Sequence, residues 1–166
     1  MHDILNRSSA AAALQPKFLA PGDGLRLQSG PGRDLIFKVT GDDTDNQFDY
    51  FIVEVGPKGG PPLHVHHRQE ETIQVLKGRF KVQCGDQTSI LEQNGFAYLP
   101  AGLPHAFLNL TDEPAEVLVV YVPGGGHKFY EELGPVARAA TPDRAAIAAV
   151  FTRHGMTLLG APLSPD

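Results

Sequence analysis

The chain has 166 residues, with 14 Lys and Arg against 19 Asp and Glu, which gives a formal net charge of −5. This length predicts one domain with a sizeable buried core. The acidic balance argues against nucleic-acid binding, which needs many cations to neutralise phosphates. The single cysteine, Cys84, excludes an internal disulfide and a zinc site built from several cysteines.

The first 24 residues carry little patterning and are predicted to form an N-terminal arm. The start Met1–Asp3 is not a basic leader, and the run Ala10–Leu14 is too short for the apolar core of a secretion signal. No stretch approaches the roughly 18 apolar residues of a membrane span. We therefore expect a cytoplasmic protein that does not associate with membranes.

Residues 25–123 consist of short β-type runs separated by Gly-, Pro- and Asp-rich turns, which predicts an all-β sandwich or barrel. The predicted strands are Leu25–Gln28, Asp34–Thr40, Phe48–Val55, Glu71–Leu76, Arg79–Cys84, Ser89–Leu91, Phe96–Leu99, His105–Asn109 and Glu116–Val122. The run Val117–Val122 is apolar on both faces, which predicts a central or interface strand.

In residues 124–166 the pattern of short β-type runs stops, and this segment is predicted to form a helical tail that packs on the barrel. A short helix is expected over Lys128–Leu133, ending at Gly134-Pro135. A second helix is expected to begin at Thr141-Pro142, with the threonine as N-cap and the proline in the first helical position.

Three of the seven histidines, His64, His66 and His67, fall within four positions. Side chains alternate along a strand, so His64 and His66 lie on one face, about 6.6–7 Å apart along the backbone. Two imidazoles at that spacing can converge on one ion, whereas His67 points to the other face. Glu71 has the opposite parity, but the intervening residues have turn character and can reset the register.

A fourth imidazole, His105, follows the turn-forming segment 100–104. Taken singly, each of these residues has an ordinary explanation: an exposed histidine pair, a solvated carboxylate, a histidine in a turn. Glu70 is an alternative carboxylate beside Glu71. Together, three imidazoles and one carboxylate form a coherent ligand set for Fe, Mn, Co, Ni, Cu or Zn, which predicts one divalent transition metal per chain.

At two motifs the chain resembles the cupin superfamily. The first is Gly60-Pro61-Pro62-Leu63-His64-Val65-His66, followed after four residues by Glu71 and after six more by Gly78. The second is Pro100-Ala101-Gly102-Leu103-Pro104-His105-Ala106-Phe107-Leu108-Asn109, although Asn94-Gly95 stands where this motif usually opens with Gly-Asp. The resemblance implies a cupin-type jelly-roll β-barrel with a metal inside, bound by His64, His66, Glu71 and His105. The spacing to Gly78 favours Glu71 over Glu70.

The strand parity also predicts residues of a substrate pocket. Ile73 and Val75 share the parity of Glu71, and Phe107 shares that of His105, so their side chains are expected to face inward. Tyr98 is a further candidate whose direction the pattern does not fix. For any one of them, a place in the ordinary core is the commoner role.

Charge near the site bears on the substrate. Among the inward positions only Lys77, at a strand end, is basic, with Lys38 as a second candidate. A sugar phosphate would call for Lys or Arg beside the metal. The pattern therefore favours a neutral or aromatic small-molecule substrate.

The chain is similar to small single-barrel cupins, which include the quercetinase-like dioxygenases that cleave flavonols. This similarity implies a metal-dependent dioxygenase in which Glu71 is both metal ligand and general base for a substrate hydroxyl. It also implies a homodimer. Two other functions stay open: a non-catalytic module that binds or senses a small molecule, and a metal-dependent isomerase or lyase that does not use O2.

Overall fold

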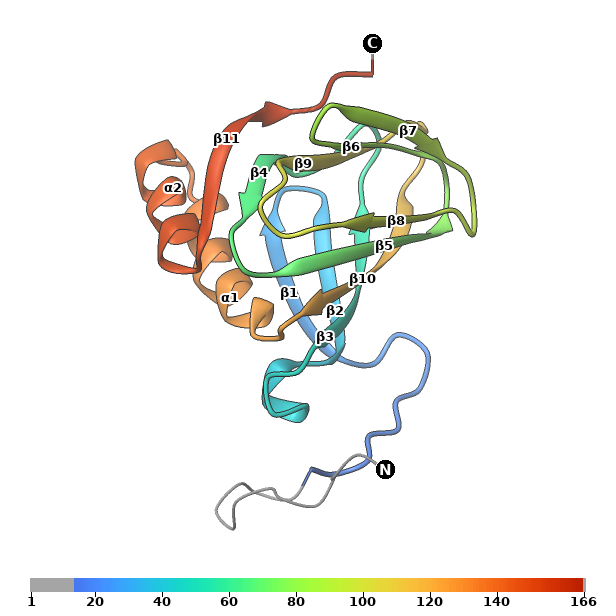
Figure 1. Cartoon of the computed structure of the whole chain (residues 1–166), viewed down its shortest axis with the longest axis vertical. Helices are drawn as coiled ribbons and strands as arrows, with labels where there is room; N and C mark the ends of the chain where they lie inside the picture. Colours follow the sequence, from blue (N-terminus) through green and yellow to red (C-terminus); the bar gives the residue numbers. More distant parts are fainter. Residues whose placement is uncertain (1–13, 166) are drawn as a thin grey trace.

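A computed structural model describes residues 14–165 and contains two antiparallel β-sheets that face each other, with two helices on one side (Figure 1). The six-stranded sheet has the order β1-β2-β3-β10-β5-β8, and the five-stranded sheet the order β11-β4-β9-β6-β7. The strands are β1 Leu25–Gly30, β2 Arg33–Val39, β3 Asp49–Val55, β4 Pro62–His66, β5 Glu70–Lys77, β6 Phe80–Cys84, β7 Gln87–Leu91, β8 Phe96–Leu99, β9 His105–Asn109, β10 Ala115–Val122 and β11 Met156–Pro162. The predicted all-β jelly-roll fold is confirmed.

The barrel core lies between the two sheets and is filled by the inward side chains of alternating strands. Phe37 on β2 and Phe51 on β3 stack with ring centroids 4.4 Å apart, and both are fully buried. Ile73 and Val75 on β5 are also fully buried in this core. The strands therefore hold their register through one continuous apolar layer.

Strand β10 is central in the six-stranded sheet, where it pairs with β3 on one side and β5 on the other. Its residues alternate between buried and half-buried, with Val117 and Val119 facing the core. The run 117–122 was expected to be a central or interface strand, and the chain itself provides its two strand neighbours. A second subunit is therefore not needed to cover β10, and the homodimer stays a prediction.

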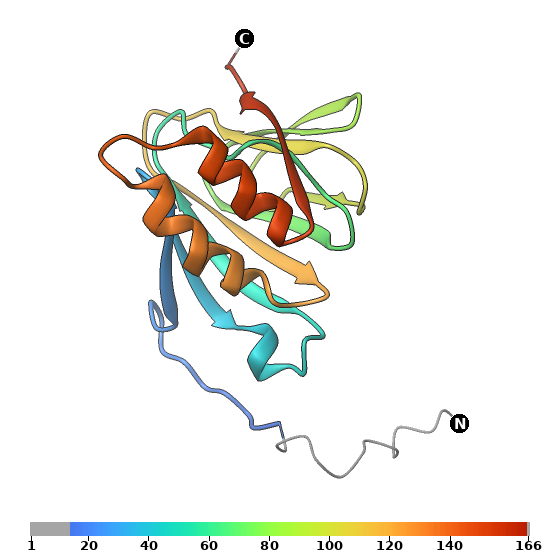
Figure 2. The same ribbon diagram turned by 90° about the vertical axis from the view of Figure 1, so that its left-hand side faces the viewer.

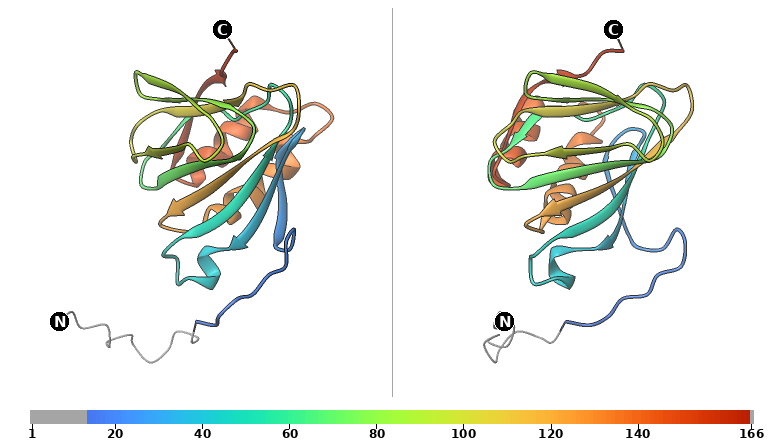
Figure 3. Two further views of the ribbon diagram at one scale, coloured as in Figure 1. Left: turned by 90° about the vertical axis from the view of Figure 1, so that its right-hand side faces the viewer. Right: turned by 45° about the vertical axis from the view of Figure 1, so that its right-hand side comes forward.

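The C-terminal segment contains two helices, α1 Gly126–Ala137 and α2 Arg144–Arg153. Figure 2 shows them side by side across one face of the barrel. Phe129 and Leu133 of α1 and Val150 and Phe151 of α2 form a second buried apolar cluster with Met156. Figure 3 shows the opposite side, where β5 to β8 lie in front and the helices behind.

Both predicted helix boundaries need correction. Helix α1 does not end at Gly134-Pro135 but continues to Ala137, and Gly134 packs closely against β1, where an added Cβ would meet the Gln28 carbonyl oxygen at 2.5 Å. Helix α2 is capped not by Thr141 but by Asp143, whose side chain accepts a hydrogen bond from the Ala145 N–H at 2.8 Å. Aspartate is as good an N-cap as threonine, and here it lies two residues nearer the helix.

The end of the chain is not helical. Strand β11 pairs with β4, with Met156 opposite His66 and Leu158 opposite His64. The predicted tail therefore includes a strand that completes the five-stranded sheet. Its sequence, MTLLGAP, shows only a brief alternation before Gly and Pro, which is a weak signal for an edge strand.

The predicted N-terminal arm, residues 1–24, lies partly outside the described residues. Its described part, 14–24, contains no helix or strand before β1 begins at Leu25. Within residues 14–165, neither helix is long and apolar enough to cross a membrane.

The loop that leads into β4 passes very close to β9. A Cβ added at Gly60 would lie 1.9 Å from the Phe107 carbonyl oxygen, a backbone atom that cannot move aside cheaply. We expect Gly60→Ala to lower the free energy of unfolding by at least about 2 kcal/mol, because the loop or β9 must shift. Urea unfolding of the variant beside wild type measures this.

Gly160→Ala is the matched control, because a Cβ at Gly160 would make only ordinary contact with Leu63, at 3.6 Å. Its unfolding midpoint should stay close to that of wild type. Equal midpoints for Gly60→Ala and Gly160→Ala would show that the loop tolerates the added atom.

Candidate metal centre

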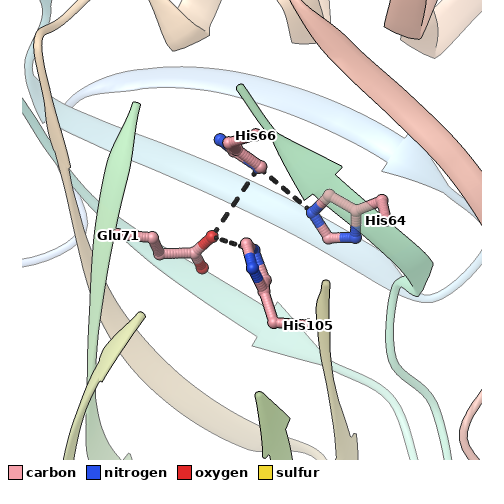
Figure 4. A group of neighbouring side chains, drawn as sticks. All are labelled: His64, His66, Glu71 and His105. Carbon is pink, nitrogen blue, oxygen red and sulfur yellow. Dashed lines mark hydrogen bonds and ion pairs between the residues drawn. The ribbon is translucent and has the colours of Figure 1, made fainter. Parts of the chain in front are cut away.

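Three strands bring the four predicted ligands together. His64 and His66 come from β4, Glu71 from β5 and His105 from β9, and Figure 4 shows their side chains pointing toward one another. One ligand atom from each lies within 4.8 Å of the others, and all four residues are buried. The β4–β9 pairing places His64 directly opposite His105 and so brings the fourth ligand beside the other three.

The distances suit a metal ion. The Nε2 atoms of His64 and His66 are 3.1 Å apart, and Oε2 of Glu71 lies 3.0 Å from His105 Nε2 and 3.8 Å from His66 Nε2. Bonds of about 2.1 Å to one ion would place neighbouring ligand atoms about 3.0–3.4 Å apart in octahedral or tetrahedral arrangements. The observed spacings lie close to this range.

The outer nitrogen of each ring fixes which nitrogen faces the centre. Nδ1 of His64 lies 2.7 Å from the Pro62 carbonyl oxygen, and Nδ1 of His105 lies 3.0 Å from that of Leu103. A carbonyl only accepts, so Nδ1 donates in both rings and the neutral ring carries its lone pair on Nε2. These contacts orient the rings as the outer partners of metal-bound histidines do.

Gln69 fixes the orientation of the His66 ring in the same way. Its Oε1 lies 3.0 Å from His66 Nδ1, while its Nε2 donates to the Pro123 carbonyl oxygen at 2.8 Å. The second bond fixes the amide orientation, so Oε1 accepts from His66. The lone pairs of His64 and His66 then face each other at 3.1 Å, which is unfavourable unless a cation lies between them. The donor set and its outer hydrogen bonds fit a transition-metal ion.

Burial keeps two of the rings in the form that binds metal. Burial, with the nearby His105 and His66, lowers the pKa of His64 well below its ordinary value. Burial lowers the pKa of His66 to about 4, although Glu71 opposes the shift. For His105 burial acts in the same direction, but the Glu71 carboxylate outweighs it and raises the pKa. His64 and His66 are therefore neutral at pH 7.

The neighbouring alternatives lie outside the cluster. His67 is exposed, and its Nε2 lies 2.8 Å from the Thr157 hydroxyl on β11. Glu70 is exposed on β5, one residue before the buried Glu71. Alternation along β5 thus separates Glu71 from Glu70, and His67 lies just beyond the end of β4.

A narrow, mainly apolar cavity adjoins His64, His66 and Glu71. Its walls come from both sheets and both helices. They consist of Ser29, Arg33, Leu35, Phe51, Val53, Pro61, Pro62, His64, His66, Glu71, Phe107, Val119, Tyr121, Phe129, Tyr130, Leu133 and Phe151.

Of the predicted pocket residues, Phe107 lines this cavity. Ile73 and Val75 face inward as expected but are fully buried in the barrel core, outside the cavity wall. The prediction for Tyr98 was wrong, because its side chain is 51% exposed. In the β5–β8 register, Leu99 lies opposite Glu71 and Tyr98 opposite Thr72, so alternation turns Tyr98 outward.

The sequence analysis missed Arg33, which projects from β2 into the cavity. The preference for a neutral substrate rested on the absence of a strong cation near the site. Arg33 is such a cation, so that argument no longer holds. Burial lowers the pKa of Arg33, but arginine stays protonated in proteins. The position precedes the apolar core of its strand and carries no local motif, so only the folded structure reveals it.

Two tyrosines were also missed. The hydroxyls of Tyr121 on β10 and Tyr130 on α1 are 2.8 Å apart, and both tyrosines line the cavity. Tyr121 lies opposite Glu71 in the β10–β5 register. Burial, followed by the charge of Glu71, raises the pKa of both tyrosines, so both hydroxyls are protonated at neutral pH.

Helices α1 and α2 close one side of the cavity with Phe129 and Phe151. The start of α1 is fixed to the barrel by Asp49, which is fully buried on β3. Its carboxylate accepts hydrogen bonds from the N–H groups of Gly126, at 2.7 Å, and Gly41, at 2.6 Å. A carboxylate at a helix N-terminus is favourable, and here it holds the cover over the cavity in place.

Residues 51–121 match the family model described as Cupin domain. The chain carries a cupin domain. The match includes all four clustered residues, so the motifs that resembled this family in the sequence are those that meet in the structure.

Known proteins similar to this cupin chain have diverse activities. It is 30% identical over 88 residues to quercetin 2,3-dioxygenase of Bacillus subtilis, covering 49% of this chain but only 26% of that protein. A solved structure of a cupin-superfamily sugar phosphate isomerase from Silicibacter pomeroyi is 28% identical, with a TM-score of 0.50 over 57% of this chain and 61% of that one. KdgF from Halomonas sp. has a TM-score of 0.60 over 68% of this chain and 99% of that one, and at 15% identity it shows the fold alone.

The site predicts metal binding that depends on His105. Untagged wild-type protein should contain about one Fe, Ni, Mn, Co, Cu or Zn per chain by elemental analysis, and His105→Ala should lose most of it, because one of four ligands is removed. His67→Ala is the control and should keep the wild-type content, since His67 is exposed beside the site. Absence of metal from wild-type protein after reconstitution would contradict the assignment.

The site also predicts an acid-sensitive metal-free protein. Below pH 6.5 the unfolded chain protonates His66, while the folded chain resists protonation down to a pKa of about 4. Stability should therefore fall as the pH drops from 6.5 to 4, by about 3 kcal/mol from this residue alone. Urea unfolding of metal-free protein across this range measures the effect.

His66→Gln should flatten the pH dependence by that amount, whereas His67→Gln, at the exposed neighbouring position, should leave it unchanged. The same slope in all three proteins would show that His66 is not the group responsible.

Proposed function

We propose that this cupin chain is a metal-dependent oxygenase that acts on a small organic substrate in the cavity beside Glu71. The observation that carries the proposal is the position of Glu71, the only carboxylate in the cavity wall, buried between the imidazoles of His66 and His105. Similarity to a quercetin 2,3-dioxygenase across 49% of this chain supports the same class.

His64, His66, Glu71 and His105 would hold the metal. When bound, a redox-active metal would supply Lewis-acid activation of a substrate oxygen and a route for electrons to O2. The chain contributes the proton transfer: the O–H bond of the substrate breaks, the proton moves to the Glu71 carboxylate, and the electron pair stays on the substrate oxygen. O2 is then the oxidant, and both of its atoms enter the product.

The cavity walls favour such chemistry because they exclude water. Phe51, Phe107, Phe129 and Phe151 line the cavity, and aromatic rings suit a planar or aromatic substrate. Closed apolar walls strengthen the electrostatic effect of Glu71 and protect a reactive anion. The cavity is narrow under the two helices, so we propose a substrate smaller than a flavonol.

A second candidate is an isomerase or lyase that uses the same residues without O2. Arg33 in the wall favours it, because a cation near the ligands suits an anionic substrate such as those of sugar-phosphate chemistry. Similarity to a structure described as a sugar phosphate isomerase is consistent with this alternative. Both candidates give Glu71 the role of proton acceptor.

The variant Glu71→Gln tests the role of Glu71 in proton transfer without changing the shape of the cavity. The amide keeps the size of the side chain and an oxygen that can bind metal, but it does not accept a proton. We expect substrate-dependent O2 uptake of the metal-loaded protein to fall by about 100-fold or more. An oxygen electrode, with a screen of small phenols and enols, measures this, and metal analysis of the variant accompanies each assay.

Glu70→Gln is the matched control, because Glu70 is an exposed carboxylate one residue before the buried Glu71 on β5. It should retain substantial O2 uptake. Turnover under strict anaerobiosis would contradict the oxygenase and favour the isomerase or lyase. Tight binding without any turnover would indicate a binding or sensing module.

A further inference from the structure

Arg33 lines the cavity together with His64 and Glu71, yet it pairs with no carboxylate in the described part of the chain. Its Nε–H donates to the Ser29 hydroxyl and one terminal N–H donates to the Ser29 carbonyl oxygen at 3.2 Å. Both acceptors are neutral. A guanidinium has five N–H groups, so three of them have no protein acceptor among residues 14–165.

Arg33 is half-buried in the cavity wall. A partly desolvated cation without a counter-ion is unfavourable, and proteins pair such groups or use them to bind anions. Glu71 is the only acidic residue in the wall, and it faces the imidazoles of His105 and His66. With a divalent ion held by one carboxylate, the cavity would carry net positive charge at both the ion and Arg33. A ligand with negative charge would balance it.

The tyrosine pair adds a second donor to the same wall. Tyr121 and Tyr130 share one hydrogen bond between their hydroxyls, so one of their two O–H hydrogens is used and the other remains for a ligand. Both rings line the cavity with Arg33. A guanidinium edge and a hydroxyl together match the planar oxygens of a carboxylate, and the wall offers no second cation for a phosphate dianion.

We infer that Arg33, with the Tyr121–Tyr130 hydroxyl pair, binds the carboxylate of a small organic acid whose remaining oxygen faces the His and Glu cluster. The inference deepens the proposed function and rests on it in taking this cavity as the substrate site. It replaces the neutral substrate expected from the sequence with an acidic one. Arg33 is then a specificity-determining residue.

The test compares a carboxylate with its neutral amide on metal-loaded full-length protein. Calorimetric titration with benzoate and benzamide, and with acetate and acetamide for a cavity too narrow for a ring, gives the preference for the charged form. Arg33→Met removes the charge but keeps an unbranched chain. Arg26→Met is the control, because Arg26 is exposed on β1, lies outside the cavity wall, and its side chain donates to the Gly22 carbonyl oxygen.

We expect wild type and Arg26→Met to bind the acid at least about 10-fold more tightly than the amide. Arg33→Met should lose that factor for the acid while its affinity for the amide and its metal content stay unchanged. Any direct attraction of the acid to the metal is common to all variants and cancels in the comparison. Equal affinity of wild type and Arg33→Met for the acid, or no preference in wild type, would overturn the inference.

Arg33→Lys covers the case in which the methionine variant does not fold. Lysine keeps the charge but cannot bind a carboxylate through two parallel N–H groups as arginine does. The preference for the acid should therefore be reduced without being lost. A lysine variant indistinguishable from wild type would overturn the two-point contact. The oxygenase can fail separately: absent O2 uptake leaves the acid-over-amide preference in place, and a lost preference leaves O2 uptake by a neutral substrate possible.

Discussion

The structure depends on one constraint: three imidazole nitrogens and one carboxylate must meet within a few ångströms inside a barrel of separate strands. Each of the three rings is aimed by a hydrogen bond from its outer nitrogen, to Pro62, Leu103 and Gln69. Two of these acceptors are backbone carbonyls, so the aim of the rings follows from the path of the chain. The proline-rich segments before His64 and His105 therefore do more than form turns, because their rigid backbone presents those carbonyls.

The same constraint explains the C-terminal segment. β11 pairs with β4 beside His64 and His66 and gives the ligand-bearing strand a second neighbour. Helices α1 and α2 then cover the cavity that these ligands face, and Asp49 fastens the start of α1 to the barrel. This cover keeps water from the carboxylate and the imidazoles. In contact with bulk water, the electrostatic interactions between these groups would be much weaker. The segment thus shapes the site without supplying a ligand.

The sequence was sufficient for the barrel and for the four clustered residues, because local patterns mark the strands and the histidines, and the resemblance to the cupin motifs adds the jelly-roll topology and Glu71. Alternation and turn residues mark the strands, and the parity of His64 and His66 together with the later His105 marks one inward-facing group. Tyr98 was misplaced because a short strand of mixed residues does not reveal its inner face. Arg33, Tyr121 and β11 escaped because their roles arise from contacts between distant strands and helices, which no local pattern encodes.

Arg33 changes what the cavity can select. A site with only imidazoles, a carboxylate and aromatic walls would bind a neutral ring mainly by apolar contact, which discriminates weakly among similar molecules. A cation in the wall adds a charge requirement, because a neutral ligand would leave the half-buried guanidinium without a counter-ion. Discrimination then comes from the penalty for the wrong ligand as much as from attraction to the right one. The fold is shared with proteins of several activities, so such wall residues, rather than the metal ligands, are where substrate choice is made.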